Sequence, residues 1–227
     1  LAPTGVLRAG INMANKLLVT GATPSGDPDG VGPEFARHIA DGLGVPVSYV
    51  QFPTPGELAD AVTENVWDIG LIGAEPTRAE KIAFTAAYVE IEATYLVPEG
   101  SPLNTIEDVD AEGVRIAVSG RSAYDLYLSR SLKHAELHRA QGLPGALELF
   151  MAEKMDALAG LRPALTGDLD KVPGGRILDG QFTAVQQAVG TARTKPEAAA
   201  YLSDVVEDAK ASGLIARLIE KHKVVGR

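Results

Sequence analysis

Residues 67–88, WDIGLIGAEPTRAEKIAFTAAY, decide the fold. The apolar run 69–72 is typical of a strand that is buried on both faces of a parallel sheet. The loop 73–76 ends this strand, and a polar helical turn that carries Arg78 and Lys81 follows. Open α/β sheets bind small ligands at the carboxyl ends of their strands, and the planar guanidinium of arginine matches a carboxylate. We therefore expect a ligand site at this strand end.

The sequence before this strand alternates strand and helix patterns. Apolar residues at i, i+3 and i+4 spacing predict a helix that begins at Pro33 and that Gly44 ends. A long loop rich in Gly, Pro, Asp and Asn, residues 12–32, precedes this helix. The predicted elements of this part are strands at 6–11, 45–52 and 67–73, and helices at 33–43 and 55–64. Two βαβ units of this kind imply a parallel sheet.

The sequence after this strand repeats the α/β pattern. An extended segment, 93–98, leads out of the first part, and residues 182–191 predict a strand that returns to it. A helix with an apolar stripe is predicted over 196–222. The other predicted elements are helices at 106–109, 123–132, 143–154 and the start of 162–171, and strands at 114–119, around Leu137 and at 155–161.

Composition excludes several classes of function. The chain of 227 residues has a formal net charge of -9, which argues against a nucleic-acid-binding face. No apolar run approaches the ~20 residues that span a bilayer. The absence of Cys excludes disulfides, thiolate metal sites and cysteine nucleophiles. The chain begins at Leu1 without an apolar leader, and we expect a mature domain from which a signal peptide has been removed.

Eight short segments, in this order and spacing, resemble extracellular solute-binding proteins of family 3. These are the type II periplasmic binding proteins that serve amino-acid ABC transporters. Each segment alone is weak, and their joint order carries the resemblance. The segments are GVLRAG (5–10), DGVGPEF (29–35), LG (43–44), WDIG (67–70), RAEKIAFT (78–85), VRIAVSGRS (114–122), MDA (155–157) and SGLI (212–215).

The resemblance implies an α/β chain with a two-lobed type II periplasmic-binding-protein fold. Two parallel-type sheets flanked by helices are expected, with a ligand cleft between the lobes. Lobe 1 is predicted to comprise residues 1–95 and 187–227, and lobe 2 residues 96–186. The hinges are expected near 93–98 and 184–190. In such proteins each lobe holds part of the ligand, so that binding favours the closed state.

The resemblance also implies roles for individual residues. Arg78 matches the arginine that binds the ligand's α-carboxylate, and Ser122 matches a second-lobe hydroxyl that donates to the same group. Ser122 also suits the N-cap of the helix that follows, and the two roles are compatible. Arg121 either is a solvated loop charge or faces the cleft. The predicted ligand-binding residues are Arg78, Ser122, Glu75, Ala74, Gly73, Asn12, Asn15, Leu17, Arg121, Ala123 and Leu161, and Asn12, Asn15 and Leu17 are expected to line the side-chain pocket.

Two positions depart from the family pattern. Glu75 stands where the family has Ser or Thr, and an anionic carboxylate ~4 Å from a ligand carboxylate would cost about 4 kcal/mol at an effective dielectric constant of about 20. Glu75 therefore points away, pairs with Arg78, is protonated or meets a donor on the ligand. Leu161 stands where the family has the acid that receives the α-amino group. Either the ligand lacks this group or Glu75 receives it; we expect the first, a small organic acid such as an aromatic or heteroaromatic one.

The function that we expect is non-enzymatic. The chain would bind a small carboxylate-bearing solute, either an organic acid or an amino-acid-like molecule, and deliver it to the permease of an ABC transporter. We expect a monomer without a cofactor, metal or catalytic residues, which is either periplasmic or extracellular and membrane-associated. One alternative is a periplasmic dehydratase similar to cyclohexadienyl or arogenate dehydratase, with Glu75 as general acid if burial raises its pKa. The other is the sensor domain of a membrane receptor.

Overall fold

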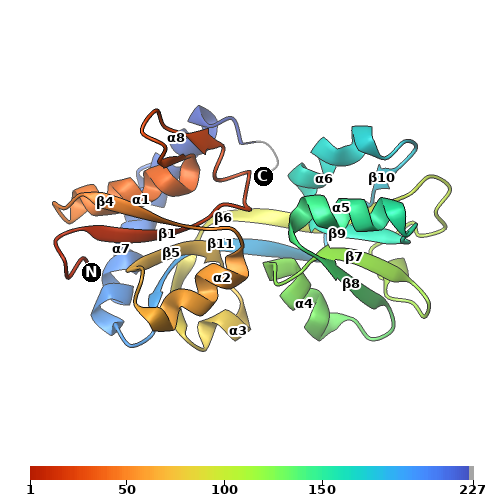
Figure 1. Ribbon diagram of the computed structural model, residues 1–227, viewed down its shortest axis with the longest axis horizontal. Helices are drawn as coiled ribbons and strands as arrows, with labels where there is room; N and C mark the ends of the chain where they lie inside the picture. Colours follow the sequence, from red (N-terminus) through yellow and green to blue (C-terminus); the bar gives the residue numbers. More distant parts are fainter. Residues whose placement is uncertain (225–227) are drawn as a thin grey trace. The chain divides into compact units, whose positions relative to one another are not determined.

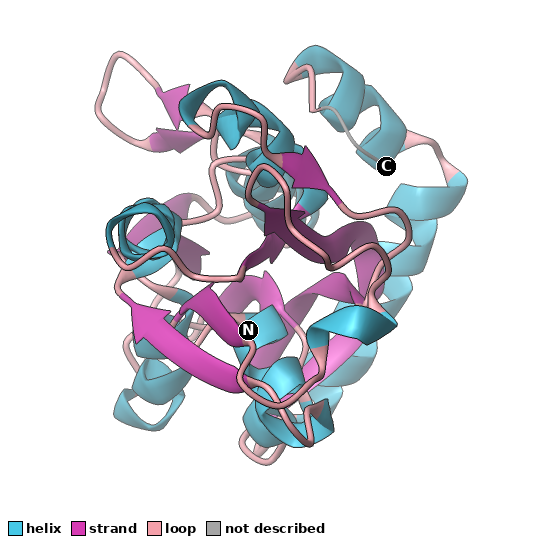
Figure 2. Cartoon of the chain, turned by 90° about the vertical axis from the view of Figure 1, so that its right-hand side faces the viewer, coloured by secondary structure: helices cyan, strands magenta, loops and turns pink. Residues whose placement is uncertain are grey.

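The structure is a computed structural model that describes residues 1–224. Its contacts divide these residues into two compact units. We define unit 1 as residues 1–90 and 186–224, and unit 2 as residues 91–185. In each unit the strands lie inside and the helices lie outside (Figures 1 and 2). The lobe and hinge boundaries expected from the sequence remain predictions.

Unit 1 contains strands in the order β4-β1-β5-β11 (Figure 1). The first three are parallel, and β11 is antiparallel to β5. The strands are β1 (Leu7–Asn12), β4 (Val47–Phe52), β5 (Ile69–Gly73) and β11 (Thr183–Ala192). The helices are α1 (Val31–Gly42), α2 (Pro55–Asp60), α3 (Pro76–Ala79), α7 (Pro196–Ala211), α8 (Leu214–Lys221) and a 3-10 helix, Ala61–Glu64. A separate hairpin pairs β2 (Gly21–Ala22) with β3 (Pro28–Asp29).

Unit 2 contains strands in the order β6-β9-β7-β8. Strand β7 is parallel to β8 and β9, whereas β6 is antiparallel to β9 and to the short β10. The strands are β6 (Ile82–Val97), β7 (Arg115–Ser119), β8 (Glu136–Ala140), β9 (Ala157–Leu161) and β10 (Arg176–Ile177). The helices are α4 (Ala123–Ser131), α5 (Gly142–Ala152), α6 (Arg162–Asp168) and two 3-10 helices, Glu107–Val109 and Leu169–Lys171.

The expectation of two parallel-type sheets is wrong. Hydrogen bonds join the strands into one nine-stranded mixed sheet, apart from the β2-β3 hairpin. The reason lies in β6 and β11, which are long and run antiparallel to their neighbours β9 and β5. Strand β6 begins in unit 1 and ends in unit 2.

Several predicted elements have different limits. The predicted loop 12–32 contains the β2-β3 hairpin, and α1 begins at Val31 rather than at Pro33. Residues 93–97 of the predicted extended segment 93–98 are the end of the longer strand β6. The predicted helix 196–222 is two helices, because Gly213 between them adopts a left-handed conformation with φ of 72°.

The sheet of unit 2 is buried on both faces, as β7 and β9 show. In β7, Ile116 and Val118 lie in one apolar cluster, whereas Ala117 lies in the other. In β9, Ala159 lies in the first of these clusters and Leu158 in the second. Side chains alternate across a strand, so two buried faces produce a continuous apolar run.

An ion pair fixes the amino ends of β1 and β5. Asp68 is completely buried, and its carboxylate accepts hydrogen bonds from the Arg8 backbone N–H at 3.0 Å, from Nε at 3.0 Å and from Nη2 at 2.8 Å. The Asp68 N–H in turn donates to the Arg8 carbonyl oxygen. Burial alone raises the pKa of Asp68, but the hydrogen bonds from Arg8 outweigh burial and hold the pKa below its ordinary value.

This pair predicts a specific dependence of stability on pH. Because the pKa of Asp68 is lowered in the folded state, its carboxylate stabilises the protein above its unfolded pKa of about 3.9 and loses this effect as the pH falls through the folded value. We expect Asp68→Asn to lower the free energy of unfolding by about 3 kcal/mol at pH 7, and the difference to shrink in acid. Urea unfolding from pH 7 to pH 3 measures it. Asp204→Asn, at an exposed position on α7, is the control, and a difference that stays constant over this range would contradict the assignment.

Candidate functional site

The register of unit 1 brings the carboxyl ends of β1 and β5 to one edge of the sheet, and β11 pairs with the end of β5. Ile11 of β1 pairs with Leu71 of β5, so the carboxyl ends of these parallel strands lie side by side. Gly73, the last residue of β5, pairs with Gln187 of the antiparallel β11. The next residue, Ala74, continues this pairing, because its N–H donates to the Gln186 carbonyl oxygen at 2.7 Å. The end of β5 is therefore held by backbone hydrogen bonds.

A short helix then turns Arg78 back toward this strand end. Glu75 is extended at the N-cap position, Pro76 begins α3, and the Ala79 N–H donates to the Glu75 carbonyl oxygen at 2.8 Å. Proline suits the first helical position because its ring presets φ and it lacks the N–H that would be unpaired there. The Nη1 group of Arg78 donates to the Gly73 carbonyl oxygen at 2.7 Å. The structure thus brings the Arg78 guanidinium to the carboxyl end of β5.

Both charged side chains of this turn are buried. The exposed fraction is 6% for Arg78 and 9% for Glu75. Ionised groups at this depth need opposite charges or hydrogen-bond partners, because the transfer from water is otherwise costly. A buried guanidinium with five N–H donors in a fixed plane is the group that binds a carboxylate with two parallel hydrogen bonds.

The loop after β1 forms a small cavity in unit 1. The side chain of Asn12 closes a turn by accepting the Ala14 N–H at 3.1 Å. Asn15 Oδ1 is buried and has no hydrogen-bond partner among the described residues. A cavity of about 10 Å³, the size of about one water molecule, is lined by Asn12, Asn15 and the buried Tyr88, among others. Burial raises the pKa of Tyr88 far above its ordinary value.

Leu17 lies on the same loop and is partly buried. Its neighbour Leu18, rather than Leu17, lines this cavity. The sequence pattern could not separate the two leucines, because the loop has no regular period that relates position to direction.

In unit 2, the predicted residues Arg121 and Ser122 lie between β7 and α4, and Ala123 is the first residue of α4. Arg121 adopts a left-handed conformation with φ of 60°, which is uncommon for a residue with a Cβ atom. Ser122 is the N-cap of α4, and its Oγ accepts the Asp125 N–H at 3.1 Å. Ser122 and Ala123 are buried, with exposed fractions of 6% and 8%. Ser122 therefore has the expected capping role.

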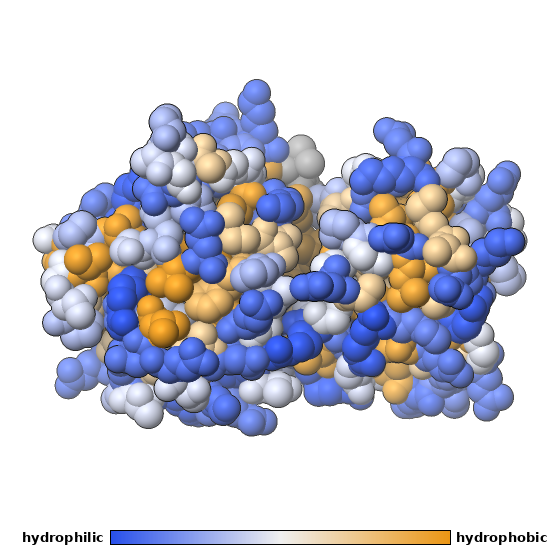
Figure 3. Space-filling view, viewed as in Figure 1, coloured by the Kyte–Doolittle hydropathy of each residue, from blue (hydrophilic) through white to orange (hydrophobic). Residues whose placement is uncertain are grey.

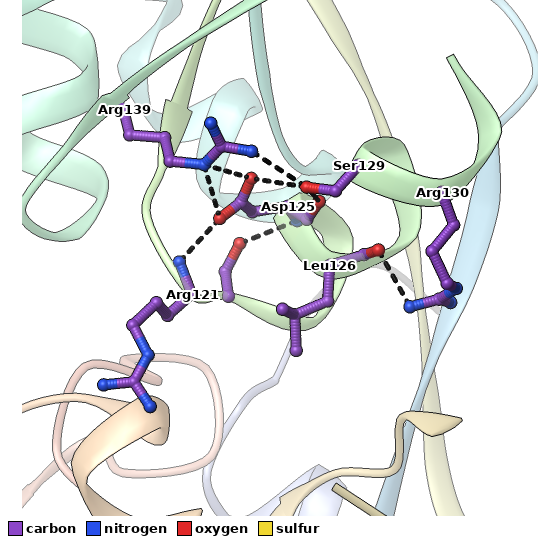
Figure 4. Close-up of polar contacts among 7 residues, drawn as sticks. Arg121, Asp125, Leu126, Ser129, Arg130 and Arg139 are labelled. Carbon is purple, nitrogen blue, oxygen red and sulfur yellow. Dashed lines mark hydrogen bonds and ion pairs between the residues drawn. The ribbon is translucent and has the colours of Figure 1, made fainter. Parts of the chain in front are cut away.

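The sequence analysis missed Asp125 and Arg139, which surround this loop in Figure 4. Asp125 is 2% exposed and accepts hydrogen bonds from the Arg121 backbone and the Arg139 side chain. The spacing Ser-x-x-Asp from Ser122 to Asp125 is a capping-box signature and could have identified Asp125. No local signal could have identified Arg139, because it comes from another strand.

Leu161 ends β9, where its backbone pairs with Ala93 of β6. Its side chain packs against the apolar cluster that contains Tyr95 and Val185. The following residue, Arg162, binds Glu92 within unit 2, with Nε 2.6 Å from Oε2. The position at which the family places an acid thus belongs to an apolar environment.

Another cluster of polar groups in unit 1 connects α1 to the end of α8. Asp29, Glu34 and His222 offer ligand atoms within 4.8 Å of one another. Glu34 already accepts hydrogen bonds from Lys221 Nζ at 2.5 Å and from His222 Nε2 at 2.9 Å, and His222 Nδ1 lies 3.2 Å from Thr20 Oγ1. Burial raises the pKa of Glu34, but these two partners outweigh it and lower the pKa overall. The cluster is a polar connection between helices.

A shallow apolar groove lies on α5 of unit 2. Its volume is about 470 Å³, and Met151 in it is 48% exposed. Figure 3 shows hydrophobic residues at this surface. The lining residues are Pro144, Leu147, Glu148, Met151 and Ala152.

The family model of the bacterial extracellular solute-binding proteins, family 3, matches residues 7–224. This chain belongs to that family. The match covers nearly the whole chain and confirms the resemblance seen in the eight sequence segments. None of the helices in residues 1–224 is both long and apolar enough to cross a membrane.

Solved structures identify the fold of this family 3 chain as that of the type II periplasmic binding proteins. A mutant of ArgBP from T. maritima has a TM-score of 0.79 at 20% identity, with 98% of this chain and 96% of that chain covered. The ancestral amino acid-binding protein AncCDT-1, a precursor of cyclohexadienyl dehydratase, has a TM-score of 0.78 at 21% identity, with 96% and 95% covered. The cysteine-binding protein from Campylobacter jejuni has a TM-score of 0.79 at 16% identity, with 96% and 89% covered. No curated protein is similar enough in sequence to count as a match.

We expect substitution of the two loop asparagines to have different effects on the free energy of unfolding of the ligand-free protein. Asn12→Ala removes the acceptor of the Ala14 N–H, and we expect a loss of about 1 kcal/mol in the free energy of unfolding. Asn15→Ala removes an oxygen that has no hydrogen-bond partner within residues 1–224, and we expect a change below about 0.5 kcal/mol. Urea unfolding followed by the fluorescence of Trp67, the single tryptophan, measures both variants. A loss at Asn15 as large as that at Asn12 would contradict the difference.

Proposed function

We propose that this family 3 protein binds a small carboxylate-bearing solute in the periplasm and delivers it to the permease of an ABC transporter. The observation that carries the proposal is the Arg78 guanidinium, buried at the carboxyl end of β5 and oriented by the Gly73 carbonyl oxygen. Ligands of open α/β sheets bind at such strand ends, and arginine is the side chain best suited to a carboxylate. The proposed role is transport without catalysis, by a monomer.

In the proposed site, Arg78 binds the carboxylate and Ser122 adds a hydroxyl donor to it. Unit 1 contributes Arg78 together with Gly73, Ala74, Glu75, Asn12, Asn15 and Leu17. Unit 2 contributes Ser122 together with Arg121, Ala123 and Leu161. The segments near residues 93–98 and 184–190 are proposed to act as hinges, so that ligand contacts with both units favour a closed state.

The proposed ligand lacks an α-amino group. Leu161 supports this class, because its side chain belongs to an apolar cluster and offers no acceptor to an ammonium. An ammonium enclosed without an acceptor would be unfavourable. Two relatives differ in this respect: an ancestral arginine-binding protein is bound to arginine, and a binding component from Wolinella succinogenes is complexed with lysine. Buried Glu75 is the group that would receive an ammonium if the ligand of this chain carried one.

A dehydratase on the same scaffold is the second candidate. It is supported by the likeness to AncCDT-1, a precursor of cyclohexadienyl dehydratase, and by the buried carboxyl group of Glu75 three residues before Arg78. Turnover of prephenate or arogenate by the purified protein, lost in Glu75→Gln, would establish it. A receptor sensor domain differs from a transport protein in what it is joined to, and a longer gene product with membrane helices would identify it.

We expect Arg78→Ala to abolish stabilisation by ligand. A carboxylate at 100 times its dissociation constant stabilises the wild type by ~2.7 kcal/mol, which is visible as a rise in melting temperature. The variant loses the group that binds the carboxylate, so its melting temperature should not change. Differential scanning fluorimetry with a panel of small carboxylates measures this shift.

The matched control is Arg193→Ala. Arg193 lies in the same unit and also donates from Nη1 to a backbone carbonyl oxygen, that of Ala79. The Arg193→Ala variant should keep the full rise in melting temperature on addition of ligand. A full shift in Arg78→Ala as well would show that the carboxylate binds elsewhere.

The ligand class is tested with pairs of molecules that differ only in the amino group. We expect 3-phenylpropanoate to bind at least as tightly as L-phenylalanine, and 5-guanidinopentanoate at least as tightly as L-arginine, because Leu161 offers no acceptor. Isothermal titration calorimetry gives the dissociation constants. A tenfold preference for the amino forms, equivalent to about 1.4 kcal/mol, would assign the ammonium to Glu75 instead.

A further inference from the structure

We propose that Asp125, paired with Arg139, is a positioning residue for the loop Gly120–Ser122 and sets the affinity of this protein for its ligand. The inference rests on the proposed function, because it assumes that this loop donates to the bound carboxylate. It concerns two residues that lie outside the predicted ligand-binding set, and all of its contacts lie within unit 2.

Asp125 holds the loop at two points. Its backbone N–H donates to Ser122 Oγ at 3.1 Å, and its carboxylate Oδ2 accepts the Arg121 N–H at 2.7 Å. A hydroxyl has one hydrogen to donate, and acceptance of the Asp125 N–H by Ser122 Oγ leaves that hydrogen for another partner. The Ser122 hydroxyl, which also hydrogen-bonds the Tyr124 side chain, and the backbone of Arg121 are therefore both in contact with Asp125.

The conformation that Asp125 holds is an unfavourable one. Arg121 has φ of 60°, a left-handed value that is disfavoured for residues with a side chain. Residues persist in such conformations where surrounding contacts fix them. The hydrogen bond to the Arg121 N–H is a charge-assisted contact of this kind, shorter and stronger than one between neutral groups.

Arg139 supplies the positive charge that the buried carboxylate needs. Its Nε lies 3.0 Å from Oδ1 and 3.2 Å from Oδ2 of Asp125, and its Nη2 donates to Ser129 Oγ at 2.8 Å (Figure 4). The side chain of Asp125 is 3% exposed, and that of Arg139 is 47% exposed. Ser129 Oγ also donates to the Asp125 backbone carbonyl oxygen at 2.8 Å. Asp125 is thus held from α4 and from β8.

The register of the sheet places Arg139 beside the loop. Val118 of β7 pairs with Arg139 of β8, and Ser119 pairs with Ala140. The Gly120 N–H then donates to the Ala140 carbonyl oxygen at 2.9 Å. The loop begins where β7 ends. Because β7 pairs in parallel with β8, the Arg139 guanidinium lies near the start of α4.

The test compares affinity and loop dynamics in the full chain. Asp125→Asn replaces the carboxylate that pairs with Arg139 by a neutral amide. Arg139→Gln removes the positive charge of the guanidinium and leaves Asp125 in place. We expect Asp125→Asn to weaken binding of the tightest carboxylate of the panel above by at least tenfold in calorimetry. Arg139→Gln should weaken it about threefold or more, and Arg139→Lys, which keeps the charge, should restore most of the affinity. Hydrogen exchange of residues 120–125 should quicken in the two weakened variants.

The matched control is Asp156→Asn. Asp156 accepts the Arg115 N–H at 2.8 Å and lies 3.6 Å from Arg115 Nε, so it makes the same type of contact at the opposite end of β7. The affinity of the Asp156→Asn variant for the same carboxylate should stay within twofold of the wild-type affinity. Each variant is measured at a temperature at which circular dichroism shows it folded, and Arg139→Gln serves if Asp125→Asn does not fold.

The outcomes separate the two proposals. Wild-type affinity in Asp125→Asn and Arg139→Gln, with or without quicker exchange, would overturn the positioning role and leave the proposed function intact. A loss of the same size in Asp156→Asn would also overturn it, because the effect would then be general. A wild-type protein that binds no carboxylate of the panel would overturn the proposed function, and the positioning role would fall with it.

Discussion

The hydrogen bond from Arg78 Nη1 to the Gly73 carbonyl oxygen is the contact on which the proposed site depends. It holds a guanidinium at the end of a strand that is itself fixed on both sides, by β1 and by β11. This hydrogen bond, together with burial of the side chain, restricts the rotamers of a long side chain, whose ordering costs up to about 2 kcal/mol. The free protein therefore already holds the cation in place, which favours ligand binding.

Contacts between a carboxylate and an arginine fix the backbone at three other strand ends. Asp68 joins the amino ends of β1 and β5 through Arg8, Asp156 holds the start of β7 through Arg115, and Asp125 holds the loop after β7. In each case one carboxylate accepts a hydrogen bond from a backbone N–H and forms an ion pair with an arginine. Such contacts fix the backbone where strands give way to loops. Of the three, the contact made by Asp125 is the one that holds a loop with candidate ligand-binding residues.

The sequence predicted the parts of the fold that have a strong local pattern. The apolar run of β5, the periodicity of α1 and the turn with Arg78 were all readable, because burial on both faces or on one helical face leaves a regular signal. The first half of β6 was not readable, because its residues are mostly half-buried and follow no strict alternation. The division of the last helix depends on one glycine, Gly213, whose positive φ a periodicity search does not detect.

The candidate site residues also differed in whether the sequence alone could predict them. Arg78 was predicted from its place after a strand end and Ser122 from the family resemblance, whereas Arg139 reaches Asp125 only through the pairing of β7 with β8. Single-sequence patterns contain no information on such pairings between distant segments. The apolar surroundings of Leu161 likewise required the structure, although the absence of an acid there was plain from the sequence.

The most direct test of the central claim is to follow the guanidinium of Arg78 by ¹⁵N nuclear magnetic resonance during titration with a small carboxylate, with its signals assigned by comparison with Arg78→Lys. The account predicts that the Nε and Nη signals of Arg78 shift and saturate with the same dissociation constant that calorimetry gives. Saturable binding that leaves these signals unchanged would show that the carboxylate is bound by another group.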